Sequence, residues 1–193
     1  MKCVNCKNKD CYKGKDCFNL KEKIKEIYEK DEKLKEMMKV ATSIEGEFYC
    51  KKNRLEEIIE FCRRMNYKKI GIAFCIGLSH EAKILSQILE NAGFEVYSIC
   101  CKVCGISKDE FNLKKIIEER EEAMCNPVGQ AYILNEKKTD LNIICGLCIG
   151  HDIIFTRYSK APVTTFIVKD RVLGHNPAIA LYCEYIKKRI NQE

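Results

Sequence analysis

The 193 residues are enough for one well-packed domain with a small appendage, and too few for two large domains. Apolar residues make up 46% and charged residues 32%, a balance that excludes a disordered or fibrous chain. The net charge of +6 does not indicate nucleic-acid binding, because lysine and glutamate alternate as on solvated helix faces and aromatic stacking residues are sparse in the basic N-terminal segment.

Fourteen cysteines are several times the ordinary usage, so the redox compartment matters for their interpretation. The N-terminus has no apolar signal sequence, and no apolar run approaches the roughly 18 residues of a membrane span. We therefore expect a cytoplasmic protein with no membrane association. In a reducing cytosol, clustered cysteines are more often metal ligands or redox-active thiols than disulfides.

The first predicted segment, residues 1–19, is Cys-rich and contains Cys3, Cys6, Cys11 and Cys17. These four thiols lie within fifteen residues of a stretch that has too few apolar residues for a core, so we expect that a metal is needed to fold it. The spacing resembles the compact N-terminal four-Cys segments of hybrid-cluster-type iron–sulfur proteins. This resemblance favours a [4Fe–4S] centre over the alternative, which is zinc.

A helical segment, residues 20–66, is expected to pack on the body of the protein. Apolar residues recur at helical spacing over 20–44, with a break near Asp31, and again over 54–65.

The remaining residues, 67–193, alternate between strand and helix patterns with short connections, which is typical of right-handed crossovers. This predicts an α/β domain with a doubly wound, mostly parallel sheet of about four strands in a Rossmann-like three-layer arrangement. The predicted strands are 69–75, 94–100, 141–145 and 163–168, and the predicted helices are 79–91, 108–124, 127–138 and 177–191.

Many of the cysteines follow these predicted strands. Ligands bind outside the carboxyl ends of strands in open parallel sheets, so we expect a second metal site at this edge. Cys125 precedes an Asn-Pro helix start, which would place its thiolate at the positive end of a helix dipole. The expected metal ligands are Cys104, Cys125 and Cys148, and the expected cofactor-binding residues are Cys75, Cys101 and Cys145.

The direction of the last side chain of a strand is not evident from sequence. It is therefore left open which of the thiols at the strand ends are ligands: Cys75, Cys100, Cys101 and Cys145. Isolated cysteines are often buried as small apolar residues, and Cys62 and Cys183 are interpreted in this way. Cys50 is left undecided.

Four polar residues are predicted at the same edge as candidate catalytic groups: His151, Asp152, His175 and Lys169. Histidine can ligate metal or transfer protons near pH 7, although either histidine could merely hydrogen-bond a helix start. Lys169 and Arg171 could bind a small anionic substrate, although a solvated charged loop is an equal alternative. The chain has no Walker A or G-x-G-x-x-G motif, so nucleotide binding is not predicted.

Several motifs together resemble an uncharacterised bacterial and archaeal family of Cys-rich proteins described as metal-binding, with about a dozen characteristic cysteines. Besides the N-terminal cysteines, they are Ile70-Gly-Ile-Ala-Phe-Cys-Ile-Gly-Leu78, Cys101-Lys-Val-Cys-Gly105, Cys125-Asn-Pro-Val-Gly-Gln-Ala131, Gly146-Leu-Cys-Ile-Gly-His-Asp152 and Ala161-Pro-Val-Thr-Thr-Phe-Ile-Val-Lys-Asp-Arg-Val-Leu-Gly-His-Asn-Pro177. The resemblance implies metal binding and supplies no reaction.

Two classes of function follow. The first is an iron–sulfur protein with one or two [4Fe–4S] clusters that acts in redox or sulfur chemistry with an electron donor or acceptor protein. As an enzyme, it would be an oxidoreductase or desulfurase-like. The second is a zinc-binding structural, regulatory or metal-delivery protein without catalysis. Sequence alone leaves open whether the chain is an enzyme.

Overall fold

The computed structural model describes residues 2–192, which divide into two compact units. The first unit ends at Lys51 and the second begins at Lys52. The helix over Arg54–Arg64, α3, is therefore grouped with the sheet that follows it. The separation into segments 1–19, 20–66 and 67–193 stays a prediction.

The first unit has little core of its own. It contains two short 3-10 helices, η1 (Cys3–Asn5) and η2 (Asp10–Lys13), and two α-helices, α1 (Lys21–Lys30) and α2 (Glu32–Phe48). The predicted break falls at Asp31, whose Oδ1 accepts a hydrogen bond from the Leu34 N–H at 2.9 Å and so caps α2. Ile44 is the one buried side chain among residues 2–51.

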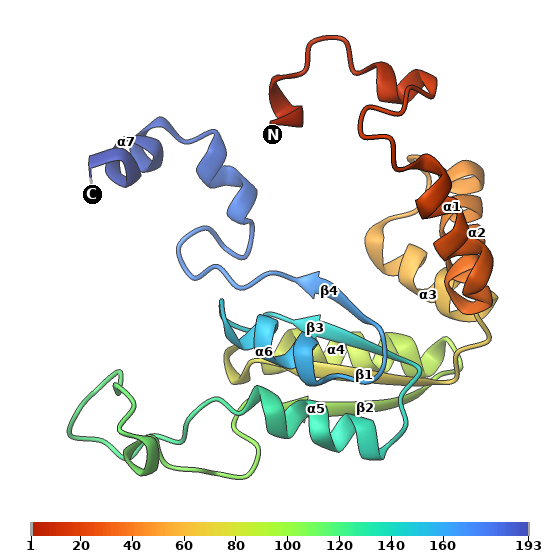
Figure 1. Cartoon of the computed structure of the whole chain (residues 1–193). Helices are drawn as coiled ribbons and strands as arrows, with labels where there is room; N and C mark the ends of the chain where they lie inside the picture. The colour runs from red at the N-terminus through yellow and green to blue at the C-terminus, as the bar shows by residue number, and fades with distance from the viewer. Residues whose placement is uncertain (1, 193) are drawn as a thin grey trace. The chain divides into compact units, whose positions relative to one another are not determined.

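The second unit is built on a four-stranded, all-parallel sheet with strand order β2-β1-β3-β4 (Figure 1). Its strands are β1 (Lys69–Phe74), β2 (Glu95–Cys100), β3 (Leu141–Cys145) and β4 (Val163–Ile167). The chain runs from β1 outward to β2 and then crosses to the other side of β1 to form β3. The order therefore reverses between β1 and β3, which is the switch point where α/β sheets of this kind bind ligands.

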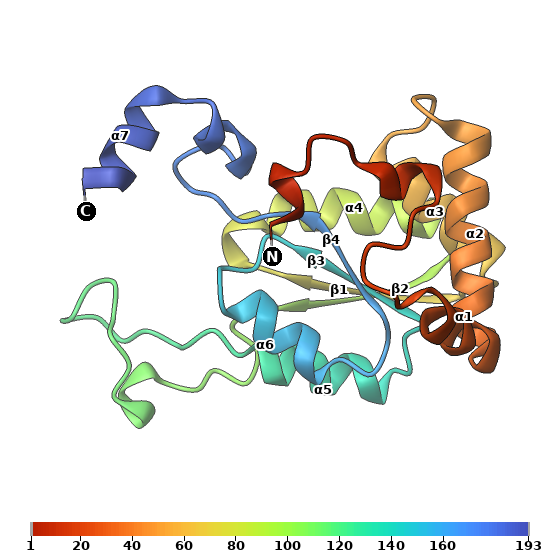
Figure 2. The same ribbon diagram turned by 45° about the horizontal axis from the view of Figure 1, so that its top comes forward.

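Helices cover both faces of the sheet, which confirms the predicted three-layer α/β fold (Figure 2). Helix α4 (Ser79–Asn91) lies on one face, and α5 (Pro127–Glu136) and α6 (His151–Tyr158) lie together on the other. The chain ends with η5 (Pro177–Leu181) and α7 (Glu184–Gln192). No helix within residues 2–192 has both the length and the apolar character needed to cross a membrane.

The core lies along the two central strands. Ile70, Ile72 and Ile143 are fully buried. Between them, the opposite face of β1 carries the small residues Gly71 and Ala73, which let α5 approach the sheet closely. Burial of several such aliphatic side chains, at about 1.5–3 kcal/mol each, is the main force that holds the strands in place.

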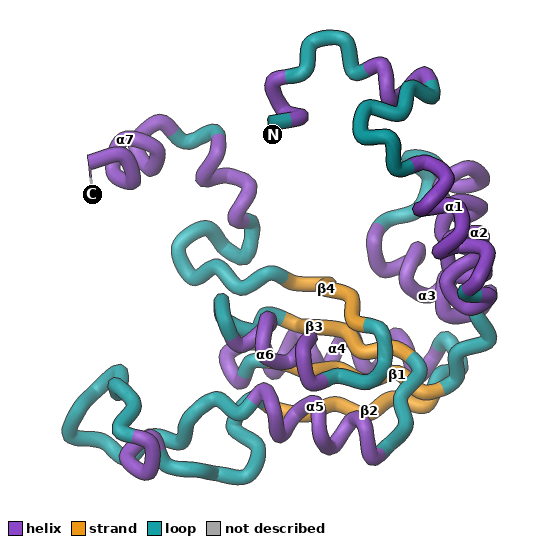
Figure 3. Tube along the Cα trace, in the orientation of Figure 1, coloured by secondary structure: helices purple, strands orange, loops and turns teal. Residues whose placement is uncertain are grey.

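Two helices depart from their predicted form. The predicted helix over 108–124 is wrong, because the chain there forms only the 3-10 turn η4 (Lys108–Phe111) and is otherwise loop (Figure 3). Asn112 ends the turn with a left-handed φ of 52°, and Glu122 pairs with Lys108 at 2.8 Å instead of facing solvent along a helix. The predicted single helix over 177–191 is divided into η5 and α7. Helix α6 was not predicted.

Gly71 gives a direct test of the close packing between β1, β3 and α5. A Cβ at this position would lie 2.0 Å from Asn142 Oδ1 and 2.9 Å from Leu134 Cδ1. We expect Gly71→Ala to lower the free energy of unfolding by about 1–3 kcal/mol, measured by urea denaturation.

The cause can be isolated with a double-mutant cycle. In an Asn142→Ala background the nearest obstacle is gone, so Gly71→Ala should cost clearly less than in the native background. Equal costs in both backgrounds would show that contact with Asn142 is not the constraint.

Candidate functional site

A cavity of about 710 Å³ lies at the carboxyl edge of the sheet. Hydrogen bonds continue past the last strand residues at this edge: the Cys75 N–H donates to the Cys145 carbonyl at 3.2 Å, and the Cys101 N–H donates to the Phe74 carbonyl at 2.9 Å. The ends of β1, β2 and β3 are therefore held level with one another. The cavity opens at this level, beside the switch point.

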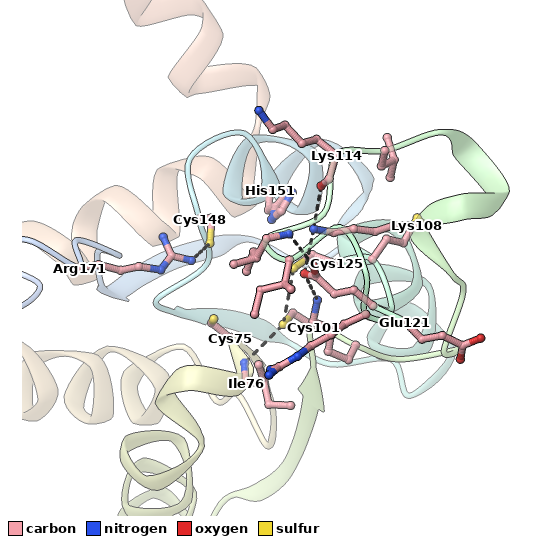
Figure 4. Close-up of a pocket in the computed structure, with 17 residues that line it drawn as sticks. Cys75, Ile76, Cys101, Lys108, Lys114, Glu121, Cys125, Cys148, His151 and Arg171 are labelled. Carbon is pink, nitrogen blue, oxygen red and sulfur yellow. Dashed lines mark hydrogen bonds and ion pairs between the residues drawn. The ribbon is translucent and has the colours of Figure 1, made fainter.

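Four cysteines from four different segments line the cavity (Figure 4). Cys75 follows β1, Cys101 follows β2, Cys125 precedes α5, and Cys148 lies between β3 and α6. In Figure 4 their sulfur atoms surround one opening, with His151 above it. These cysteines, His151 and Arg171 are the sequence-predicted residues that the structure brings together.

Cys101 and Cys125 form a pair of thiols in the cavity. Their Sγ atoms are 3.9 Å apart and share a hydrogen bond. This hydrogen bond, helped by the charges of Lys102 and His151, lowers the pKa of Cys125 to about 5 against the opposing effect of burial. The same contact, together with burial, raises the pKa of Cys101. Cys125 is therefore the thiolate of the pair at neutral pH.

The start of α5 fixes the position of Cys125. Asn126 caps this helix by accepting a hydrogen bond from the Gly129 N–H at 2.8 Å, and Pro127 occupies its first turn. The Asn126 N–H donates to the Cys101 carbonyl at 2.8 Å. The two ends of the loop over 101–126 consequently meet at the Cys101–Cys125 pair.

Cys148 has a different partner. The Nη2 atom of Arg171 donates a hydrogen bond to Cys148 Sγ at 3.0 Å, and this contact raises the pKa of the arginine. The backbone N–H of His151, the first residue of α6, donates to the Cys148 carbonyl at 2.9 Å. A cation therefore stands beside this sulfur.

Two predicted thiols of the sheet edge lie outside the cavity lining. Cys145 is fully buried in β3, and burial raises its pKa to about 11. Cys104 is exposed in the loop after β2, with a left-handed φ of 73°. Cys100, at the end of β2, is half-buried and also outside the lining.

Three of the four predicted catalytic residues also lie elsewhere. Asp152 accepts a hydrogen bond from the neighbouring Ile153 N–H at 2.8 Å. His175 closes a turn by accepting a hydrogen bond from the Asp170 N–H at its Nδ1, at 3.0 Å. Lys169 extends toward Gly77, where an added Cβ would be 3.3 Å from its Nζ.

The cysteines of the first unit are not gathered into a site. Cys3, Cys6, Cys11 and Cys17 are all exposed. Throughout residues 2–192, no three His, Cys, Asp or Glu side chains are arranged so that they could hold one metal ion. Of the remaining cysteines, Cys50 is exposed, Cys183 is half-buried and Cys62 is fully buried.

The loop residues that form the far wall of the cavity are not among the site residues predicted from sequence. The alternation of lysine and glutamate over 114–122 predicts a solvated helix face, whereas several residues of this stretch line the cavity. The Ser107 and Glu110 capping pattern is visible in sequence and indicates a turn there, but it does not indicate where the turn leads. The missed cavity residues are Lys102, Lys108, Leu113, Lys114, Ile116, Ile117, Arg120, Glu121, Glu122 and Met124.

The model of a family described as a protein of unknown function, DUF1847, matches residues 12–166. The chain belongs to the DUF1847 family. A relative, the uncharacterised protein MJ0455 of Methanocaldococcus jannaschii, is 64% identical over 191 residues, which are 98% of each chain. No solved structure matches the chain. The expected membership of an uncharacterised family with archaeal members is confirmed.

The two groups of cysteines differ in how far the region that matches the DUF1847 family covers them. Residues 12–166 include Cys75, Cys101, Cys125 and Cys148, so the thiols of the cavity all lie within the matched region. Three of the four N-terminal cysteines precede it.

The pKa difference between thiols predicts their reactivity in the metal-free, folded protein. Cys125 should react with iodoacetamide at pH 7, because its pKa is lowered to about 5, and the rate should fall as the pH drops through that value. Cys62 should stay unmodified until the protein unfolds, because it is fully buried and its pKa is raised to about 12. Peptide mapping by mass spectrometry measures both rates, and similar rates for the two residues would contradict the assignment.

Proposed function

We propose that this DUF1847 protein binds an iron–sulfur centre in the cavity and uses it in redox or sulfur chemistry, with Cys75, Cys101, Cys125 and Cys148 as ligands. The observation that carries the proposal is that four thiols from four separate segments line one cavity. Cysteines that serve only as small buried residues have no need to face a shared opening.

The separation of Cys101 and Cys125 fits two ligands of one metal atom. Two thiolates on one tetrahedral zinc ion, each about 2.3 Å from it, are about 3.8 Å apart. Cys101 Sγ and Cys125 Sγ are 3.9 Å apart. Each iron of a [4Fe–4S] cluster takes one cysteine, so this pair would move apart when such a cluster assembles. In this proposal the four thiols move into place as the centre assembles, and because cysteine then holds every iron, the centre supplies electron-transfer chemistry in the cavity.

The charges around the thiols suit such a centre. Four thiolates and their metal carry a net charge of about −2. Lys102 and Arg171 line the same cavity, and Arg171 already contacts one of the sulfurs. Basic side chains in these positions offset the negative charge that the centre would bring into a partly buried site.

Iron–sulfur is proposed over zinc because the cavity leaves open space next to the thiols, which a cluster of irons and sulfides needs and a single zinc ion does not. The alternative remains a zinc protein with a structural, regulatory or metal-delivery role and no catalysis.

A second centre is proposed in the first unit, with Cys3, Cys6, Cys11 and Cys17 as ligands. All four are exposed in a stretch that has no buried residue, so ligand binding rather than a core would order them. This centre would exchange electrons with a partner protein, in keeping with a cytoplasmic oxidoreductase or desulfurase-like enzyme.

His151 is the predicted catalytic group that stands in position to act. It lines the cavity beside the thiols, so its imidazole can deliver or remove a proton at a bound substrate. Asp152, Lys169 and His175 would act only through other residues, because they lie outside the lining.

Metal and acid-labile sulfide analysis of protein purified without oxygen tests the proposal. We expect about eight irons and eight sulfides per chain, with a broad absorption band at about 400 nm. The double substitution C101S/C125S should lower both numbers to about four, because it removes two of the four proposed ligands of one cluster.

Cys50→Ser is the matched control, because Cys50 is exposed and lies outside the cavity. It should leave the iron content unchanged. Zinc without sulfide would overturn the iron–sulfur proposal in favour of the alternative, and protein without any bound metal would overturn both.

A further inference from the structure

Cys101 and Cys125 are held opposite each other by the backbone around them. The Asn126 N–H donates to the Cys101 carbonyl at 2.8 Å, and the Cys101 N–H donates to the Phe74 carbonyl at 2.9 Å at the end of the sheet. A disulfide forms only between cysteines whose backbones lie close together. These hydrogen bonds therefore meet one condition for a covalent bond between the two residues.

The chain before Cys125 is paired as well. The Met124 N–H donates to the Ile106 carbonyl at 2.8 Å, and Ser107 forms a β-bridge with Ala123. The two ends of the loop are thus hydrogen-bonded to each other over several residues. This pairing keeps Cys125 next to its partner without help from a bound ligand.

The sulfur atoms need only a small movement to bond. They are 3.9 Å apart in the structure. A disulfide bond is about 2.05 Å long, so closure requires a movement of about 2 Å, which rotation of the two side chains can supply. The Ile76 N–H donates to Cys101 Sγ at 3.3 Å and so holds this sulfur at the cavity.

The two thiols differ in their access to solvent. Both line the cavity, but Cys101 is only 2% exposed, whereas Cys125 is half-buried. A small oxidant that enters the cavity therefore reaches Cys125 first. An accessible thiol with a second thiol beside it is the arrangement of the oxidised and the resolving cysteine in redox-sensitive proteins.

We propose that Cys101 and Cys125 are a redox-active dithiol that hydrogen peroxide converts to a disulfide when no metal is bound. Peroxide oxidises the Cys125 thiol to a sulfenic acid and releases one water. The Cys101 sulfur then attacks the Cys125 sulfur, forms the S–S bond and displaces the hydroxyl as a second water. In total, the two thiols give two electrons and two protons to one peroxide, which becomes two waters.

The dithiol stands on these two residues alone, and its consequence rests on the proposed function. A disulfide withholds two of the four ligands from the proposed centre, so the centre cannot assemble until a reductant restores both thiols. Oxidation would thereby control when the cavity is loaded with metal.

Peptide mapping by mass spectrometry tests the dithiol in the full chain, freed of metal with a chelator and titrated with hydrogen peroxide. We expect a Cys101–Cys125 cross-link at least about tenfold more abundant than any other pairing of cavity cysteines, and its reversal by dithiothreitol. In Cys101→Ser, Cys125 should remain as a sulfenic acid that dimedone labels.

Cys75→Ser is the matched control, because Cys75 lines the same cavity but is not part of the pair. It should leave the cross-link unchanged. No cross-link in the native chain, or a dominant cross-link that includes Cys75 or Cys148, would overturn the inference.

The effect on metal loading is measured with cobalt(II), which binds thiolates without added sulfide. The four N-terminal cysteines are replaced so that only the cavity thiols are tested: C3S/C6S/C11S/C17S. We expect the oxidised form to bind cobalt at least about tenfold more weakly than the reduced form, and dithiothreitol to restore binding. Equal cobalt binding by the two forms would overturn the control of metal loading.

Iron and sulfide analysis of the purified native chain separates this inference from the proposed function. A cross-link in a chain that is purified without any metal overturns the proposed function alone. A chain that is purified with iron and sulfide, and forms no Cys101–Cys125 cross-link once they are removed, overturns this inference alone.

Discussion

The parallel pairing of β1 with both β2 and β3 is the constraint on which the site depends. Because the three strands run in the same direction and in register, their carboxyl ends reach one edge together, and residues far apart in sequence become neighbours there. The free energy that holds the cavity thiols together comes from the buried aliphatic core of the sheet, not from the sulfur atoms. The placement of these thiols around one cavity is therefore a property of the fold.

The two groups of cysteines differ in this respect. Those of the cavity are placed by strand ends and a helix start, so they line one cavity before any ligand arrives. Those of the N-terminal segment are exposed and have no core beneath them, so a ligand would have to do the ordering. Loss of a ligand would then leave the cavity largely formed, whereas the N-terminal segment would have nothing to hold it in one conformation.

Much of the fold was predictable from local patterns. The strands are apolar runs with β-branched residues, and the Asn126-Pro127 pair marks the start of α5, so the order of elements and the parallel sheet followed from short stretches of sequence. The general rule about strand ends then placed Cys75, Cys101 and Cys148 in one region, and the helix start at Asn126-Pro127 marked Cys125 as a further candidate. These predictions needed no information about contacts between distant residues.

The missed features depend on such contacts. Successive side chains of a strand point to opposite faces, so the difference between Cys75 at the cavity and Cys145 in the interior appears only once the register is known. In the same way, the Lys and Glu pattern over 108–124 fits a helix locally, but Glu122 binds Lys108 and Ser107 bridges to Ala123, so the segment folds back on itself.

The loop over 101–126 leaves the body and returns to it at nearly the same point, since Asn126 hydrogen-bonds to Cys101. A loop with a closed base is structurally separable: its length and composition can change while the strand before it and the helix after it keep their positions. Cys101 and Cys125 lie at this base, and the other residues of the loop that line the cavity lie beyond it. A change of loop would therefore alter the wall of the cavity and leave these two thiols in place.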